Sequence, residues 1–226
     1  MKIACIADLH GELPAPPRDA DLIVIAGDVC PDFSRAKDVN IGQQRRWLNS
    51  HFRRWIEDLD TEVVAVWGNH DYIGERPHDI PKLPWTLLKD ETIETQGLRI
   101  HGTPWVPRLP YWAFYGTGET LRRRADLIPR GLDILVSHGP PFGVGDLVPA
   151  PRTENRRVKY NQFGDENVGD PTLNAAIAQQ KPWLTVCGHI HEARGIYELA
   201  GQKVANVAAV DELYRLRDDP WLIVDK

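Results

Sequence analysis

The chain has 226 residues, a length typical of one sizeable α/β domain, and no shift in composition marks a boundary, so we expect a single domain over residues 1–226. Its formal net charge of −5 argues against high-affinity nucleic-acid binding but leaves room for a small phosphorylated substrate. The N-terminus lacks a signal-peptide pattern, and no apolar run approaches the roughly 18 residues of a membrane span, so we expect no membrane association.

The first half of the chain predicts three strands and one long helix. Strands are expected at 2–8 and 21–27, joined by a Pro-rich link at 13–17 that excludes a helix. Apolar residues recur at helical spacing over 43–59 with arginines between them, which predicts an amphipathic helix with a solvated basic face. The helix leads to a third strand at 62–67. Its tryptophans could face the sheet or a partner subunit, so a homodimer remains an alternative.

Shorter elements follow in the second half. Strands are expected at 85–88, 93–95, 98–101, 133–137 and 184–187, a hairpin at 196–199 and 204–208, and an edge strand at 221–224. Helices are expected at 119–127 and at 171–180, the latter capped by Asp170. Residues 146–170 show no periodicity and predict a long loop that is either functional or disordered. A crossover helix first and hairpins later predict two packed sheets with helices outside.

Five of the apolar runs end in polar side chains. The clearest is Val63–Trp67, which stops abruptly at Gly68 and is followed by Asn69, His70 and Asp71. The side chains that follow the other four runs are Asp8 and His10, Asp28, His138, and His189 and His191. Open α/β sheets keep their sites at the carboxyl ends of strands, so this pattern predicts a metal site assembled from strand ends.

These side chains supply more ligands than one ion needs. The candidate ligands are two carboxylates, one amide oxygen and four imidazoles: Asp8, His10, Asp28, Asn69, His138, His189 and His191. Mixed imidazole and carboxylate ligation suits two ions of Mn, Fe, Zn or Ni better than Ca or Mg. Two ions about 3.5–4 Å apart need a shared anionic bridge, for which Asp28 is the best candidate.

The ordered blocks resemble those of the calcineurin-like metallophosphoesterases. The blocks span residues 8 to 191 and are Asp8-x-His10, Gly27-Asp28, Gly68-Asn69-His70-Asp71, Ser137-His138 and Gly188-His189-x-His191. The resemblance implies an α/β fold of four layers, with two mixed β-sheets flanked by helices. It implies two divalent or mixed-valence metal ions, one held by Asp8, His10, Asp28 and His191 and the other by Asp28, Asn69, His138 and His189. It also implies that His70 is the catalytic histidine near the leaving group and that Asp71 orients it.

Within this family the segments 102–105, 137–141 and 188–192 look most like those of the metallophosphoesterase-domain-containing cyclic nucleotide phosphodiesterases. Leu9 stands where Thr is frequent, but this is not a ligand position. Val207 and Ala208 follow Asn206 where these relatives usually carry Ala-Ser. The nearer resemblance implies a phosphodiesterase for cyclic or small nucleotides, in which a metal-bridging hydroxide attacks in line and protonated His70 assists the leaving group.

Other functions remain as alternatives. The same site could serve a phosphomonoesterase or a protein phosphatase. A non-catalytic interaction scaffold would require missing ligands, and none is missing here. A nuclease is disfavoured because the chain is acidic and shows no basic stripe.

Several further residues have both a functional and a structural interpretation. An aromatic group could stack a nucleobase or form core: Trp105, Trp112, Phe114 and Tyr115. A basic group in the long loop could close over a phosphate or simply be solvated: Arg152, Arg156, Arg157 and Lys159. We expect structural or surface roles for His51, His78 and His101. The odd set of Cys5, Cys30 and Cys187 predicts reduced, mostly buried thiols and a cytoplasmic location.

Overall fold

A computed structural model describes residues 1–34, 37–149 and 166–226 of the chain. Its first β-sheet has the strand order β13-β1-β2-β3-β4. The strands are β1 (Lys2–Ile6), β2 (Leu22–Ala26), β3 (Val63–Val66), β4 (Thr86–Leu87) and β13 (Leu222–Asp225). Strands β1 to β4 are parallel and β13 pairs antiparallel with β1 at the edge. The carboxyl ends of β1, β2 and β3 therefore lie along one edge of the sheet.

The second sheet has the order β11-β12-β10-β7-β6-β5. The strands are β5 (Glu91–Thr95), β6 (Leu98–Thr103), β7 (Ile134–Ser137), β10 (Leu184–Cys187), β11 (Gly195–Leu199) and β12 (Gln202–Asn206). The four inner strands are parallel, and the edge strands β5 and β11 pair antiparallel with β6 and β12. The sheet thus presents the carboxyl ends of β7 and β10 next to each other.

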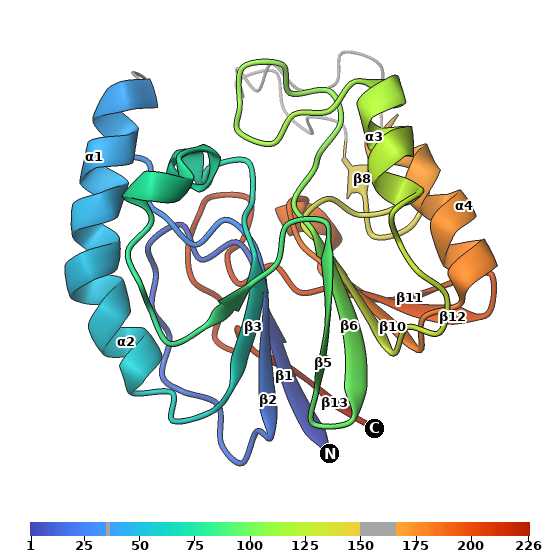
Figure 1. Ribbon diagram of the computed structural model, residues 1–226, viewed down its shortest axis with the longest axis horizontal. Coiled ribbons are helices and arrows are strands. Elements are labelled where there is room, and N and C mark those ends of the chain that lie inside the picture. The colour runs from blue at the N-terminus through green and yellow to red at the C-terminus, as the bar shows by residue number, and fades with distance from the viewer. Residues whose placement is uncertain (35–36, 150–165) are drawn as a thin grey trace.

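The two sheets pack face to face and helices cover their outer faces (Figure 1). Apolar side chains of both sheets, such as Val24, Val64, Ile100 and Val186, form the buried core between them. Helices α1 (Lys37–Trp47) and α2 (Arg53–Glu57) cover the first sheet, and α3 (Gly118–Ala125) and α4 (Pro171–Gln180) cover the second. Short 3₁₀ turns follow at Tyr72–Glu75, Pro77–Asp79 and His191–Ala193. This arrangement confirms the predicted class, an α/β sandwich of two mixed sheets flanked by helices.

The sheets are joined directly beneath the ends of their strands. The Ala7 N–H donates to the Val207 carbonyl at 3.1 Å, and the Ala209 N–H donates back to the Ala7 carbonyl at 2.8 Å. Ala7 follows β1 of the first sheet, whereas Val207 follows β12 of the second. Because these backbone bonds clamp the two sheets together, the residues that follow β1 and β12 are held in a fixed relation.

The helix predicted for 43–59 is longer and less regular than expected. It begins at Lys37 and includes a π-helical turn, Leu48–Phe52, between α1 and α2. Trp55 is buried against the first sheet and its indole N–H donates to the Pro14 carbonyl at 2.7 Å, which fixes the Pro-rich link. Arg45, Arg46 and Arg54 are exposed, as the predicted basic face requires. The tryptophan face of this helix therefore packs on its own sheet.

The two described ends of the segment 146–170 contain short strands. Short strands β8 (Leu147–Val148) and β9 (Glu166–Asn167) pair antiparallel at its two ends. The Asp146 carboxylate accepts hydrogen bonds from Gly143, Asn167 and Gly169, which fastens both ends. Two-residue strands are too short to leave a periodic pattern in the sequence. The four basic residues between 152 and 159 lie outside the described residues.

The remaining expected elements agree with the structure except at their boundaries. The strand expected at 85–88 is reduced to Thr86–Leu87, and the second arm of the hairpin ends at Asn206. Cys5, Cys30 and Cys187 are free and buried, as predicted. Among the described residues, no helix is long and apolar enough to cross a membrane.

The N-cap of α4 is as predicted and provides a test of the fold. The Asp170 carboxylate accepts from the Thr172 N–H at 2.8 Å, satisfying one of the free donors of the first turn. We expect Asp170→Ala to lower the free energy of unfolding by about 1 kcal/mol. Urea unfolding followed by tryptophan fluorescence measures this loss. Asp170→Asn keeps an acceptor and should lose less; an alanine variant as stable as the parent protein would contradict this role of the cap.

Candidate metal centre

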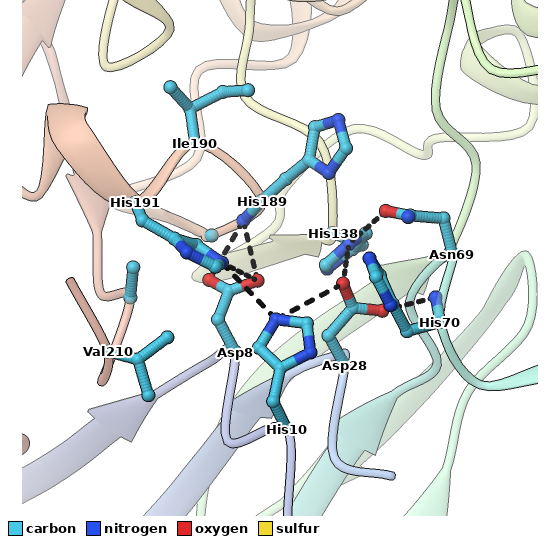
Figure 2. A network of polar contacts seen from close by, with 12 residues as sticks. Asp8, His10, Asp28, Asn69, His70, His138, His189, Ile190, His191 and Val210 are labelled. Carbon is cyan, nitrogen blue, oxygen red and sulfur yellow. Dashed lines mark hydrogen bonds and ion pairs between the residues drawn. The ribbon is translucent and has the colours of Figure 1, made fainter. Parts of the chain in front are cut away.

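The predicted strand-end residues converge on one point at the edge shared by the two sheets (Figure 2). Three overlapping groups of side chains offer nitrogen or oxygen atoms within 4.8 Å of one another. The groups are Asp8, His10 and His191; His10, Asp28 and His70; and Asp28, His138 and His189. Asn69 joins them because its Oδ1 lies 2.9 Å from His138 Nε2. The structure thus brings together all seven candidate ligands and His70.

The first group connects the end of β1 with the turn after β10. The two Asp8 carboxylate oxygens accept from the His189 N–H at 3.0 and 2.9 Å, and His191 Nε2 lies 3.7 Å from Asp8 Oδ1. His10 Nε2 and His191 Nε2 face each other at 3.2 Å. Two imidazole nitrogens and a carboxylate therefore converge on a small volume between the sheets.

Asp28 belongs to both the second and the third group. Its Oδ2 lies 3.2 Å from His138 Nε2 and 3.9 Å from His10 Nε2, while its Oδ1 accepts from the His70 N–H at 2.7 Å. A carboxylate that contacts donors from both groups can bridge two cations. The bridging role that the sequence suggests for Asp28 stays a prediction.

Backbone carbonyls orient two of the imidazoles. His138 Nδ1 donates to the Ala26 carbonyl at 2.8 Å and His191 Nδ1 donates to the Asp211 carbonyl at 3.2 Å. In each case the other nitrogen, Nε2, is directed toward the carboxylates. Such outer contacts hold metal-binding histidines in one orientation. The contact from Asp211 was not predictable because that residue lies far along the chain, with no motif around it.

Four of the candidate ligands have strained backbone conformations. Asp8, His10, Asp28 and His189 have positive φ angles of 53°, 45°, 52° and 70°. Residues with a Cβ rarely adopt this left-handed conformation, and it persists only where the surrounding structure imposes it. The strain lies at residues that carry the ligand atoms, which is typical of a functional site.

Two glycines allow the close approach of the carboxylates. A Cβ on Gly68 would collide with Asp28 Oδ1, and a Cβ on Gly188 would collide with Asp8 Oδ2. Both glycines immediately precede candidate ligands, Asn69 and His189. The glycines of these two sequence blocks are therefore required by the space beside a carboxylate.

The environment of each group sets its charge. Burial lowers the pKa of His10 to about 4 and that of His189 to about 3, so both rings are neutral near pH 7 and keep a lone pair for a cation. Burial also disfavours charge on His138, but the carboxylate of Asp28 outweighs it and raises the pKa to about 9. Burial would raise the pKa of Asp28, yet His138 and His70 hold it well below its usual value.

The structure corrects the role expected for Asp71. His70 Nδ1 bonds to Asp32 Oδ2 at 2.6 Å, so Asp32 is the side chain that holds this ring. The Asp71 carboxylate instead accepts backbone N–H groups of Gly68 at 2.8 Å, Cys30 at 2.8 Å and Val29 at 3.3 Å. Asp71 therefore fixes the two strand-end loops to each other. No motif surrounds Asp32, and only its position four residues after Asp28 places it near the site.

Tyr214 is a second residue that the sequence does not reveal. Its ring lies 4.7 Å from that of His10 and 5.0 Å from that of His191, in edge-on orientation. Its loop is fixed by Asp211, whose carboxylate accepts from the Leu213 and Arg215 N–H groups. The half-exposed Tyr214 ring thus covers one side of the histidine cluster.

The four aromatic residues considered for base stacking separate in the structure. Phe114 is buried in the core over the first sheet, and the Trp105 indole N–H donates to Asp90 Oδ2 at 2.9 Å. Tyr115 lines a separate cavity beside α3. Trp112 alone contacts the centre, with its ring 4.2 Å from that of His70. His51 and His78 are exposed, and buried His101 bonds to Thr92, so all three lie outside the cluster.

The donor set fits a divalent transition metal. Imidazoles, carboxylates and one amide oxygen are the ligands that Mn, Fe, Zn and Ni accept, whereas Ca and Mg favour oxygen alone. The buried carboxylates of Asp8 and Asp28 favour a cation beside them, because isolated charge is costly in a protein interior. The chain therefore provides a candidate metal centre with ligands from both sheets.

Comparison with known proteins agrees with this arrangement. The sequence profile of the family described as "Calcineurin-like phosphoesterase" matches residues 1–217. Metallophosphoesterase domain-containing protein 1 of Homo sapiens and of Mus musculus are each 37% identical over 251 aligned positions, covering 98% of this chain and 70% of the relative. UPF0046 protein T07D4.2 of Caenorhabditis elegans is 33% identical over 134 residues. The aligned part covers 59% of this chain and only 31% of that protein.

Solved structures share the fold. One crystal structure superposes with a TM-score of 0.62 at 13% identity, covering 92% of this chain and 90% of the other. The crystal structure of TT1561 of Thermus thermophilus gives a TM-score of 0.51 at 14% identity, covering 92% and 88%. At these identities the likeness establishes a common fold and nothing further.

The reassignment of Asp71 predicts a loss of stability. Asn at this position replaces one acceptor oxygen with an N–H₂ group that faces a buried backbone donor. We expect Asp71→Asn to lower the free energy of unfolding by about 1–3 kcal/mol. Thermal and urea unfolding measure the loss. Asp32→Asn, at a more exposed carboxylate, is the matched control and should change stability much less; equal losses for the two variants would contradict the assignment.

Proposed function

The chain belongs to the calcineurin-like phosphoesterase family and is a metal-dependent phosphoesterase, and from this premise we propose that it hydrolyses phosphodiesters, namely cyclic or other small nucleotides. The observation that carries the proposal is the pair formed by His70 and Asp32 beside the metal centre. A phosphodiester with an alkoxide leaving group needs a proton donor at the departing oxygen. His70 is held where it can act as that donor.

Two ions complete the proposed centre. One would be held by Asp8, His10, Asp28 and His191, and the other by Asp28, Asn69, His138 and His189. Bound there, such ions would supply an activated water nucleophile near pH 7 and would neutralise charge on the phosphoryl oxygens. Mn, Fe, Zn and Ni all suit the ligands.

Two carboxylates near His70 keep its imidazole protonated, which an acid catalyst requires. Burial lowers the pKa of His70, but the negative charges of Asp28 and Asp32 outweigh it and raise the pKa above the usual value. His70 therefore keeps its proton at a pH where an ordinary histidine begins to lose it. Because Nδ1 is bonded to Asp32, Nε2 is the nitrogen left to donate to a leaving group. Asp32 thus acts as a positioning residue for His70.

A substrate panel tests the diesterase proposal. We expect metal-reconstituted protein to hydrolyse bis-p-nitrophenyl phosphate and at least one class of 2′,3′- or 3′,5′-cyclic nucleotide faster than p-nitrophenyl phosphate. Chelation should abolish turnover, Mn²⁺ should restore it, and elemental analysis should find two ions per chain. Turnover confined to monoesters would favour a phosphomonoesterase or protein phosphatase instead.

The acid role of His70 predicts a dependence on the leaving group. Alkoxides leave poorly without a proton, so His70→Ala should slow alkyl diesters by about 10²- to 10⁴-fold and p-nitrophenyl diesters much less. Rates on the two substrate classes measure the difference. Equal losses on both would remove His70 from the acid role.

Asp32→Asn gives an independent test by pH profile. The acid works only when protonated, so kcat/KM falls as pH rises through the pKa of His70. Removing the Asp32 charge lowers that pKa, and the alkaline limb of the profile should move to lower pH. The exposed variant Asp38→Asn serves as control and should leave the profile unchanged. An unshifted limb in Asp32→Asn would contradict the coupling.

A further inference from the structure

A cavity of about 580 Å³ opens beside the metal centre on the His70 side. Its lining residues are Asp32, Phe33, Ser34, Tyr72, Tyr111 and Trp112. Four of the six are aromatic, and the two others, Asp32 and Ser34, are polar. A cavity of this size is in the range of small-molecule binding pockets.

The cavity shares walls with the proposed proton donor. Asp32, one lining residue, bonds to His70, and the ring of Trp112, another, lies 4.2 Å from the His70 ring. A substituent on the His70 side of a phosphoryl group at the metal centre would therefore meet this wall. The cavity is the space that such a substituent would enter.

The walls suit a flat aromatic group. The rings of Tyr72 and Trp112 are nearly parallel, at an interplanar angle of 19° and a centroid distance of 6.0 Å. Phe33 and Tyr111 are 41% and 89% exposed, so two large rings face solvent at the mouth of the cavity. Exposed aromatic side chains beside a partly buried stack provide the flat surfaces on which nucleobases bind.

Helix α1 holds both sides of the cavity in place. The buried Asn40 carboxamide accepts from the Phe33 N–H at 2.8 Å and the Ser34 N–H at 3.1 Å. One turn later, Gln44 donates to the His70 carbonyl at 2.7 Å and accepts from the Ile73 N–H at 3.1 Å. Two buried polar side chains of α1 thus fix the segments that carry Phe33 and Tyr72. A pocket preorganised in this way loses little entropy on binding.

We infer that this cavity is a binding subsite for the planar heteroaromatic base of the substrate, stacked against Trp112, Tyr72 and Tyr111. The inference rests on the proposed nucleotide diesterase function for its ligand class. Base binding itself requires no hydrolysis. The subsite can therefore be tested separately from the reaction.

Binding of adenosine, which carries the base but no phosphate, is the direct test. We expect adenosine to bind the metal-loaded protein, measured by calorimetry and by quenching of tryptophan fluorescence, whereas ribose does not bind. Tyr111→Ala should weaken adenosine binding by about 5-fold or more, the lower end of the range for loss of a stacked ring. Tyr111→Phe keeps the ring and should bind as the parent protein does.

Tyr115→Ala is the matched control because Tyr115 lies on the same loop but lines a different cavity. It should leave adenosine binding unchanged. Failure of adenosine to bind at its solubility limit, or equal binding by Tyr111→Ala and the parent protein, overturns the subsite. Adenosine binding that depends on Tyr111 in a protein that hydrolyses only monoesters would retain the subsite and overturn the diesterase proposal alone.

Discussion

The buried carboxylate of Asp28 is the feature on which the rest of the centre depends. It follows β2 in the first sheet and contacts His138 from the second sheet, His10 from the neighbouring strand end and the backbone of His70. A buried charge is tolerated only with compensating partners, and its described partners here are mainly imidazoles. That requirement explains the high pKa of His138, and it also explains why a site of this kind accepts cations.

The residues at the strand ends were predictable because each strand and the polar side chain at its end lie in one short, contiguous stretch of sequence. An apolar run of β-branched residues that stops at Gly and a polar side chain forms a buried strand whose end meets its neighbours, and this alone assembled Asp8, Asp28, Asn69, His138 and His189. The partners of those residues were not predictable. Asp71 and Asp32 are both carboxylates near His70, and only the backbone turn after Asn69, which directs Asp71 under three N–H groups, decides which of them reaches the ring.

Helix α1 shows why amphipathic patterns miss functional segments. The pattern of apolar residues begins near Gln43, yet the helix begins at Lys37. Its first turns bury Asn40 and Gln44, which are polar and therefore look like surface positions in the sequence. They are buried because each side chain satisfies backbone groups of a loop beside the centre. A buried polar residue in a helix is thus a sign of loop support that periodicity cannot detect.

The same two side chains link the fold to the chemistry. Gln44 bonds to the backbone on both sides of Asp71, at His70 and at Ile73, so the position of the proposed proton donor is set by packing of α1 on the first sheet as much as by Asp32. Asn40 fixes the loop that carries Asp32 itself. Because one helix supports both members of the pair, their 2.6 Å contact is maintained by the hydrophobic core beneath α1. Precision at the centre therefore originates in apolar burial some distance from it.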